Sequence, residues 1–320
     1  VLFRSEPNIY YSEGLCLHCF AEYFEESDYY YQAIEKFQQG LSLDRTEYKL
    51  WQAIGNSYAY IGDIELDAEA YEKSAKFYTK ALNLKIDPFY FFEYAVVLCR
   101  LAELQKDLSL LEQSLSFFEQ AFSLNRTKDL PPEWLMEHAQ ALDLMGEFQE
   151  ESFYYLKAIE QISQLLAINS EFPQGHHRLA SVFLHLAELS SEIEYFYEAL
   201  KHFQKALEQD EEDDQLFLGW GICLINLSQN VFHAEEASIL YQEAEQKLLQ
   251  AAKLGNEQAS YYLSCLYSLL KDHEKSFYFL QKAHLTNALP PLEELSDEEW
   301  LDELRSTSLF QQFIEYLDRS

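Results

Sequence analysis

The chain has 320 residues, of which 55 are acidic and 23 are basic, so its formal net charge at pH 7 is −32. A surface this negative repels phosphate groups, which argues against direct binding of nucleic acid and against attachment to an anionic membrane. It suits a protein or peptide partner whose contact residues are flanked by Lys or Arg. Hydrophobic residues make up 48% of the sequence and only 9 Gly and 7 Pro occur, so we expect a packed, helical protein with short turns.

The sequence predicts no membrane span and no disulfide framework. The most apolar run, residues 216–227, is too short to cross a bilayer and predicts a buried core helix. The five cysteines are scattered and odd in number, which favours reduced thiols and a cytoplasmic protein. Because the sequence begins at Val1, a removed signal or an upstream domain stays open.

A pattern of small and large residues recurs seven times along residues 12–289. Each copy pairs a small residue of one predicted helix with a small residue of the next, and a large residue stands three positions before the second. The first-helix residues are Ala21, Gly55, Ala95, Ala139, Ala180, Gly221 and Ser264. The second-helix residues are Gly40, Ala81, Ala121, Ala158, Ala206, Ala251 and Ala283. Small residues let two helix backbones approach closely, so the pattern predicts seven antiparallel helix hairpins.

The spacing within each pair predicts hairpins of different lengths. The two small residues are 19 residues apart in the first, fourth and seventh copies, 26 apart in the second, third and fifth, and 30 apart in the sixth. The increments of 7 and 11 residues are close to two and three helical turns of about 3.6 residues. Whole-turn insertions lengthen a helix and keep the same face toward its neighbours.

Turn residues agree with this division. Within hairpins, turns are predicted at Gly62-Asp63, Lys106-Asp107, Gly146-Glu147, Ser190-Ser191 and Lys271-Asp272. Between hairpins, breaks are predicted at Asp87-Pro88, Pro131-Pro132, Pro173 and the acidic run 210–214. After Pro290-Pro291 the pattern stops, and an acidic, amphipathic segment follows.

The second copy carries the most specific motif. Trp51, Ile54, Gly55 and Tyr58 have the spacing W-x2-L-G-x2-Y of the first helix of a tetratricopeptide repeat (TPR), with Ile in place of Leu. On this motif, and on the small and aromatic residues of the second helix, the chain resembles the TPR family. The resemblance implies an all-α, right-handed α-solenoid of TPR-type antiparallel helix hairpins with a C-terminal capping helix. We expect residues 1–11 to be a lead-in, 12–289 the repeat array and 290–320 the capping segment.

The resemblance also implies where a partner binds, because in this family the first helices line a concave wall. Carrying helix positions over from Trp51–Tyr58 predicts a peptide groove made of Gln52, Asn56, Phe92, Val96, Met136, Gln140, His177, Arg178, Ser181, Leu218, Ile222 and Tyr261. His18 and Glu22 in the first copy and Cys265 in the last hold equivalent positions, and Glu93 lies close to the same wall. Family members that capture a chaperone's C-terminal carboxylate use Lys, Asn and Arg there; only Asn56 and Arg178 match, in distant repeats, which argues against that role.

No residue pattern predicts an active site, a cofactor or a metal. Cys16, His18 and Cys19 fall on a helix with no second ligand pair nearby, which favours a structural role. His176 and His177 are neighbours on a helix and point about 100° apart, so they are poorly placed to act as a dyad. No Gly-rich phosphate loop, no G-x-S-x-G and no H-E-x-x-H motif occurs.

The function expected from the sequence is a non-catalytic, chaperone-like scaffold or adaptor that holds a polypeptide segment in the concave groove. Two alternatives stay open. One is a structural subunit of a larger assembly that uses its convex face. The other is a peptide-responsive switch whose output domain lies outside these residues.

Overall fold

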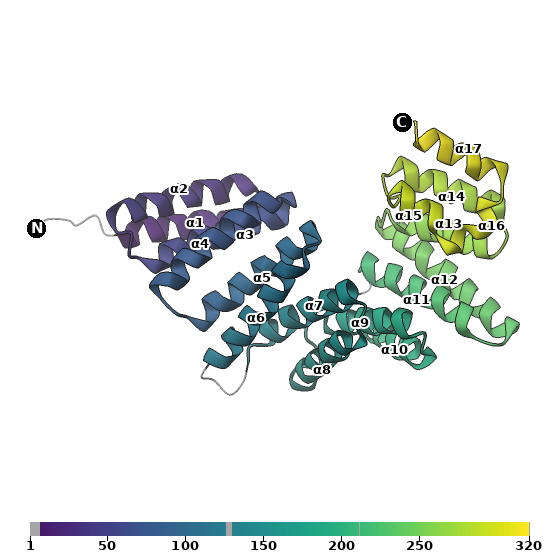
Figure 1. The fold of residues 1–320 in the computed structure, drawn as a ribbon, viewed down its shortest axis with the longest axis horizontal. Coiled ribbons are helices and arrows are strands. Elements are labelled where there is room, and N and C mark those ends of the chain that lie inside the picture. The colour runs from purple at the N-terminus through teal and green to yellow at the C-terminus, as the bar shows by residue number, and fades with distance from the viewer. Residues whose placement is uncertain (1–6, 126–129, 211, 320) are drawn as a thin grey trace, which may run out of the picture. The chain divides into compact units, whose positions relative to one another are not determined.

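The computed structural model describes residues 7–125, 130–210 and 212–319, which form helices and turns without a strand (Figure 1). The chain divides into two units, residues 1–161 and 162–320, with the boundary inside helix α8. No helix of the described part is both long and apolar enough to cross a membrane.

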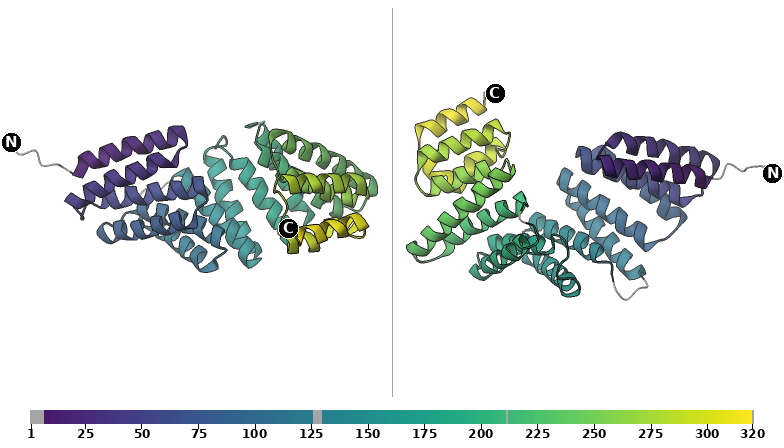
Figure 2. Two further views of the ribbon diagram at one scale, coloured as in Figure 1. Left: turned by 90° about the horizontal axis from the view of Figure 1, so that it is seen from above. Right: turned by 180° about the vertical axis from the view of Figure 1, so that it is seen from behind.

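The first unit is built of long antiparallel helix pairs. Helix α1 packs on α2, α3 on α4 and α5 on α6, and each pair also contacts the next (Figures 1 and 2). The helices are α1 (Pro7–Phe24), α2 (Ser27–Leu43), α3 (Tyr48–Glu65), α4 (Ala68–Leu84), α5 (Pro88–Gln105), α6 (Leu108–Leu124), α7 (Pro132–Gln149) and the first part of α8 (Ser152–Ile168). The expected lead-in is partly helical, since α1 begins at Pro7; residues 1–6 lie outside the described residues.

The second unit continues with pairs of less uniform length and ends in several short helices. Its helices are the rest of α8, α9 (Gly175–Ser190), α10 (Ile193–Leu207), α11 (Asp214–Asn230), α12 (Ala234–Leu254), α13 (Ala259–Leu269), α14 (His273–Leu285), α15 (Leu292–Asp297), the 3-10 helix η1 (Glu299–Leu301), α16 (Asp302–Arg305) and α17 (Ser308–Leu317). The apolar run 216–227 lies in α11, where Leu216, Leu224 and Leu227 are buried, as predicted. Leu295, Leu301 and Phe310 of the last segment share a buried cluster with residues of α13 and α14.

A repeated hydrogen bond fixes the register of the hairpins. The Ser74 hydroxyl of α4 donates to the carbonyl of Gly55 in α3 at 2.8 Å, and Ser114 of α6 donates to Ala95 of α5 at 2.7 Å. In α14, Ser276 donates to Ser264 of α13 at 2.8 Å. These serines are buried and have no access to water, so the bonds also satisfy hydroxyls that would be costly to leave unpaired.

The glycines predicted as turn residues serve packing instead. Helix α3 runs past Gly62 to Glu65, and the turn is made by Leu66, whose φ of 51° is left-handed, and by the N-cap Asp67. A Cβ on Gly62 would come within 2.8 Å of the Tyr71 ring. The predicted turns at Gly62-Asp63 and Gly146-Glu147 are therefore wrong, and each lies four residues early. The turns at Lys106-Asp107 and Lys271-Asp272 are confirmed, and that at Ser190-Ser191 is confirmed to within one residue.

The predicted length differences are wrong for the first and fourth hairpins. Helices α1, α3, α5 and α7 each have 18 residues, and α2, α4, α6 and α8 each have 17. Gly14 faces Phe37 as Gly55 faces Tyr78, so Gly14 is the true partner of Gly40, 26 residues away. Likewise Gly146 faces Tyr155 as Gly62 faces Tyr71, which places Leu165, not Ala158, 26 residues after Ala139.

The ambiguity has a simple origin, because residues 7 apart lie on the same helix face. Real variation is confined to the second unit, where α12 has 21 residues and α13 and α14 have 11 and 13. Lengthened helices themselves are confirmed: Gly55 and Ala95 are 40 residues apart, against about 34 in a typical TPR.

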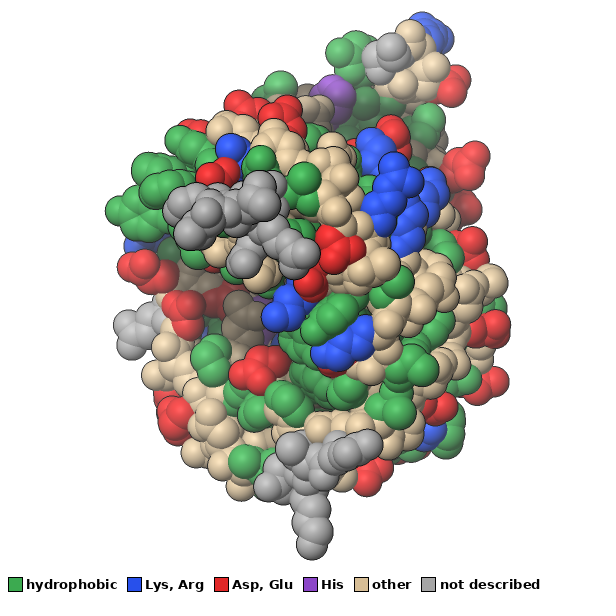
Figure 3. All heavy atoms as spheres, turned by 90° about the vertical axis from the view of Figure 1, so that its left-hand side faces the viewer, with side chains coloured by type: hydrophobic (Ala, Val, Ile, Leu, Met, Phe, Trp, Pro, Cys, Tyr) green, Lys and Arg blue, Asp and Glu red, His purple; other side chains and the backbone are tan. Residues whose placement is uncertain are grey.

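Some of the acidic side chains act as helix N-caps. Asp67, Asp87 and Asp107 each accept a hydrogen bond from a backbone N–H in the first turn of α4, α5 and α6. Such caps typically contribute about 1 kcal/mol each, and a carboxylate also interacts favourably with the positive helix N-terminus. The face in Figure 3 shows further carboxylates scattered among neutral and hydrophobic side chains.

Candidate functional site

A recess opens on the first unit between three first helices. It has a volume of about 310 Å³, and every residue that lines it comes from α3, α5 or α7. These residues are Asn56, Ala59, Tyr60, Asp63, Phe92, Glu93, Val96, Val97, Arg100, Glu133 and Glu137. No residue of α2, α4 or α6 takes part, so the recess lies on the wall that the resemblance assigned to ligand binding.

Three predicted groove residues, Asn56, Phe92 and Val96, meet in this recess. Phe92 is only 6% exposed and stacks on Trp134, with ring centroids 4.7 Å apart, so it forms part of a rigid apolar floor. Gln52 is also buried, and Met136 and Gln140 are half-buried on α7 without lining the recess. Contact of these last three residues with a peptide stays a prediction.

Carboxylates surround the apolar floor. Asp63 and Glu133 are exposed, whereas Glu93 and Glu137 are half-buried. The one cation in the lining, Arg100, is already paired, since its Nη2 lies 3.0 Å from Oε2 of Glu137. Burial opposes the charge of Arg100, yet Glu137 and other acidic neighbours raise its pKa. The recess therefore has a surplus of negative charge.

Glu93 is the most enclosed of these carboxylates. The pKa of Glu93 is raised to about 7, chiefly by burial; a hydrogen bond from Tyr78 opposes the shift, and the charge of Glu137 adds to it. The Tyr78 hydroxyl lies 3.3 Å from Oε2 of Glu93 and also donates to Oδ1 of Asn56. Tyr78 belongs to α4 and has no exposed surface, so it supports both recess residues from behind.

The wall continues from the recess toward α1. Tyr60 stacks on Tyr30 with centroids 5.4 Å apart, and the imidazole of His18 meets both rings edge-on at 5.1 and 4.7 Å. Burial lowers the pKa of His18, and Glu22, whose Oε1 is 3.4 Å from Nδ1, opposes this. Both His18 and Glu22 were assigned to the wall from the sequence. Tyr60 was not, although it is 40% exposed and well placed to contact a ligand.

The other six predicted groove residues lie in the second unit. Leu218 and Tyr261 are 5% and 7% exposed and belong mainly to the core, Arg178 is exposed, and Ile222 is half-buried. His177 lines a smaller pocket of about 230 Å³, where α9 begins, α10 ends and α11 begins. How these residues contribute to binding stays a prediction.

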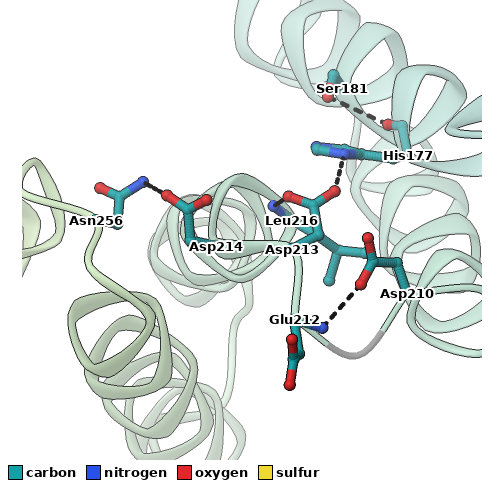
Figure 4. A network of polar contacts seen from close by, with 8 residues as sticks. All are labelled: His177, Ser181, Asp210, Glu212, Asp213, Asp214, Leu216 and Asn256. Atoms are coloured by element: carbon teal, nitrogen blue, oxygen red, sulfur yellow. Dashed lines mark hydrogen bonds and ion pairs between the residues drawn. The ribbon is translucent and has the colours of Figure 1, made fainter. Parts of the chain in front are cut away.

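Figure 4 shows the polar contacts around His177. Nδ1 of His177 lies 2.8 Å from Oδ2 of Asp213, and Oδ1 of Asp213 accepts from the N–H of Leu216 as an N-cap of α11. The hydroxyl of Ser181 donates to the backbone carbonyl of His177 at 3.2 Å rather than to its ring. Ser181, His177 and Asp213 therefore lack the serine-to-imidazole bond of a catalytic triad.

Within the described residues, no three His, Cys, Asp or Glu side chains are grouped so that they could hold a metal ion. Cys16 and Cys19 are exposed on α1, whereas His18 is buried between Tyr30 and Tyr60. His176 meets His202, with their Nδ1 atoms 2.9 Å apart, and burial lowers the pKa of both. Burial therefore disfavours the charged form of both histidines, and their rings stack with centroids 5.1 Å apart.

No protein-family model and no curated protein sequence matches the chain. Among solved structures it is similar to PilW, a widely conserved type IV pilus biogenesis factor, with 16% identity, 78% of this chain and 97% of PilW covered, and a TM-score of 0.54. It is also similar to the S. pombe nuclear import adaptor Nro1, with 11% identity, 78% of this chain and 95% of Nro1 covered, and a TM-score of 0.52. The C-terminal part of a TPR repeat-containing protein from Cytophaga hutchinsonii is 14% identical, with 89% of this chain and 98% of that protein covered and a TM-score of 0.51.

At these identities the likeness concerns the fold. It confirms the class expected from the sequence: the chain is an α-solenoid of TPR-type helix hairpins.

Proposed function

We propose that this protein is a non-catalytic interaction scaffold that binds a polypeptide segment on the first helices of the first unit. The observation that carries the proposal is the recess between α3, α5 and α7, which combines an apolar floor with a carboxylate rim. Similar folds include a nuclear import adaptor, which supports a scaffold role in general terms. The five unpaired thiols suit a reducing compartment such as the cytoplasm.

The recess fits a segment that carries Lys or Arg. The aliphatic stem of such a side chain matches Phe92 and Val96, and its charged head matches Asp63 and Glu133. A phosphate group would meet four carboxylates and an arginine that is already paired. The recess is therefore suited to a basic polypeptide and unsuited to nucleic acid.

Reversing one rim charge tests the proposal. Glu133 is exposed at the recess, so Glu133→Lys is expected to weaken the binding of basic peptides about tenfold and to leave the fold intact. The matched control is Glu119→Lys, an equal charge change at an exposed position of α6, away from the recess. Arrays of short synthetic peptides, graded in Lys and Arg content, would be probed with all three proteins. Equal losses in the two variants would show that only the net charge matters and would contradict a specific recess.

A second candidate function, assembly through another face, is favoured by one exposed aromatic group. Phe20, Tyr23 and Phe24 of α1 are 51%, 81% and 51% exposed, and Tyr29 stacks on Phe24 at 5.9 Å. Phe20 and Phe24 lie on the side of α1 opposite His18 and Glu22, so this group is separate from the wall. Exposed aromatic groups of this kind mark contact surfaces in many proteins.

A further inference from the structure

The recess confines more negative charge than its own residues neutralise. Asp63, Glu93, Glu133 and Glu137 all line a space of about 310 Å³, and the single guanidinium of Arg100 is 3.0 Å from Glu137. A like charge nearby raises the free energy of ionising a buried carboxyl, and the charge of Glu137 raises the pKa of Glu93 in this way. A cation from outside would remove that cost, and a proton on Glu93 also removes it.

Glu93 is the carboxyl at which such an exchange would take place. Its side chain lies on α5, in the middle of the three helices that form the recess, and its Oε2 accepts from the Tyr78 hydroxyl at 3.3 Å. The titratable and charged groups that line the recess with Glu93 are Tyr60 and Asp63 of α3, Arg100 of α5, and Glu133 and Glu137 of α7, and Tyr78 of α4 bonds to it from behind. Among these, only Arg100 can offer a positive charge, and Glu137 already holds it.

We propose that the recess exchanges a proton for a cation: when a Lys or Arg side chain of the bound segment enters, the Glu93 carboxylic acid releases its proton to solvent and the carboxylate faces the incoming charge. The exchange rests on the proposed function, because the cation is carried by the bound polypeptide. The charges balance, since one positive charge enters the recess as one proton leaves. The segment therefore binds more tightly as the pH rises.

The direction and the pH window follow from linkage. Burial raises the pKa of Glu93 to about 7 in the free protein, and an adjacent cation lowers the pKa in the complex. Between these two pKa values binding releases a proton, and affinity rises by up to about tenfold per pH unit. Above about 7 the carboxyl is already ionised in the free protein and affinity levels off. Burial lowers the pKa of His18, and this ring lies on α1 outside the lining of the recess.

The test uses the full chain and N-acetylargininamide as the probe, with N-acetylcitrullinamide as its uncharged analogue. Carbon-13-labelled glutamate carboxyl signals, with Glu93 assigned by Glu93→Gln, would be titrated by NMR without and with each probe. The pKa of Glu93 is expected to fall when the arginine probe binds and to stay unchanged with the citrulline probe. The dissociation constant is expected to decrease about tenfold or more from pH 5.5 to pH 7.5 in the wild type and to stay flat in Glu93→Gln.

The outcomes separate this inference from the scaffold proposal. Glu133→Gln serves as the matched control, expected to weaken binding at every pH while keeping the wild-type slope. Arginine binding whose affinity is independent of pH in the wild type would overturn the proton exchange and leave the scaffold proposal intact. Absence of arginine binding at every pH would overturn cation entry, and the peptide arrays would then decide the scaffold function separately. The pH dependence of the wild-type dissociation constant is measured without any variant, so a Glu93→Gln protein that failed to fold would not obscure that result.

Discussion

Replacing Tyr78 with alanine is expected to lower the free energy of unfolding by about 3–5 kcal/mol. Its ring has no exposed surface, lies against Gly55 and shares a buried cluster with Tyr71, Val97 and Leu101, so removing it leaves a cavity between two hairpins. Urea unfolding followed by circular dichroism would measure the loss. A matched control is Tyr23→Ala at a side chain that is 81% exposed, for which we expect a change within about 0.5 kcal/mol.

The variant Tyr78→Phe separates the contribution of the hydroxyl to stability from that of the ring. It keeps the packing and removes the donor to Asn56 and Glu93, for an expected loss of about 1–2 kcal/mol. If Tyr78→Ala lowered the free energy of unfolding no more than Tyr23→Ala does, the Tyr78 ring would not be packed between these hairpins. It would then also not support the floor of the recess.

Replacing Gly62 with alanine is expected to destabilise the protein by about 1–3 kcal/mol, although alanine is favoured over glycine within a helix by up to about 1 kcal/mol. The added Cβ would come within 2.8 Å of the Tyr71 ring. Tyr71 cannot move aside easily, because it is 3% exposed and its hydroxyl donates to Asp63 at 2.5 Å. The crowding therefore outweighs the gain in helix propensity.

The companion variant is Leu66→Gly, which is expected to stabilise the protein by about 1 kcal/mol. Leu66 has a left-handed backbone at φ 51° and ψ 42°, which a residue with a Cβ adopts at a cost, and its side chain is 73% exposed. Thermal and urea unfolding of both variants would be compared. If Gly62→Ala raised the stability and Leu66→Gly lowered it, the turn would lie at Gly62-Asp63 and not at Leu66.

The hairpin architecture could be predicted from the sequence because close helix contacts require small residues. Gly55 and Ala95 mark such contacts in both sequence and structure, and the serine bonds at these positions confirm the pairing. The register of Ala21 and Ala158 could not be determined from residue size alone, since a small residue two turns away satisfies the same pattern. The structure resolves it through the rings that face Gly14 and Gly146.

The recess was only partly predictable for a related reason. Transferring two positions from the motif to each helix identified Asn56, Phe92 and Val96, which lie level with the Trp51–Tyr58 motif. Asp63 lies almost two turns beyond Asn56, as Arg100 lies one turn beyond Val96, so the transferred positions did not reach them. The one available signal was periodicity: Asn56, Tyr60 and Asp63 are spaced to share one helix face.

Site-specific photo-cross-linking is the most direct test of binding at the recess. Tyr60, which is 40% exposed at the recess, would be replaced with p-benzoylphenylalanine, and in a second protein the same replacement would be made at Tyr23 in the exposed aromatic group. After irradiation in a cell extract, mass spectrometry would identify the attached segments. We expect Tyr60 to yield adducts with polypeptide segments that contain Lys or Arg, and we expect Glu133→Lys to reduce them. Adducts from Tyr23 alone, or Tyr60 adducts unaffected by Glu133→Lys, would contradict the account and favour assembly through the aromatic group of α1.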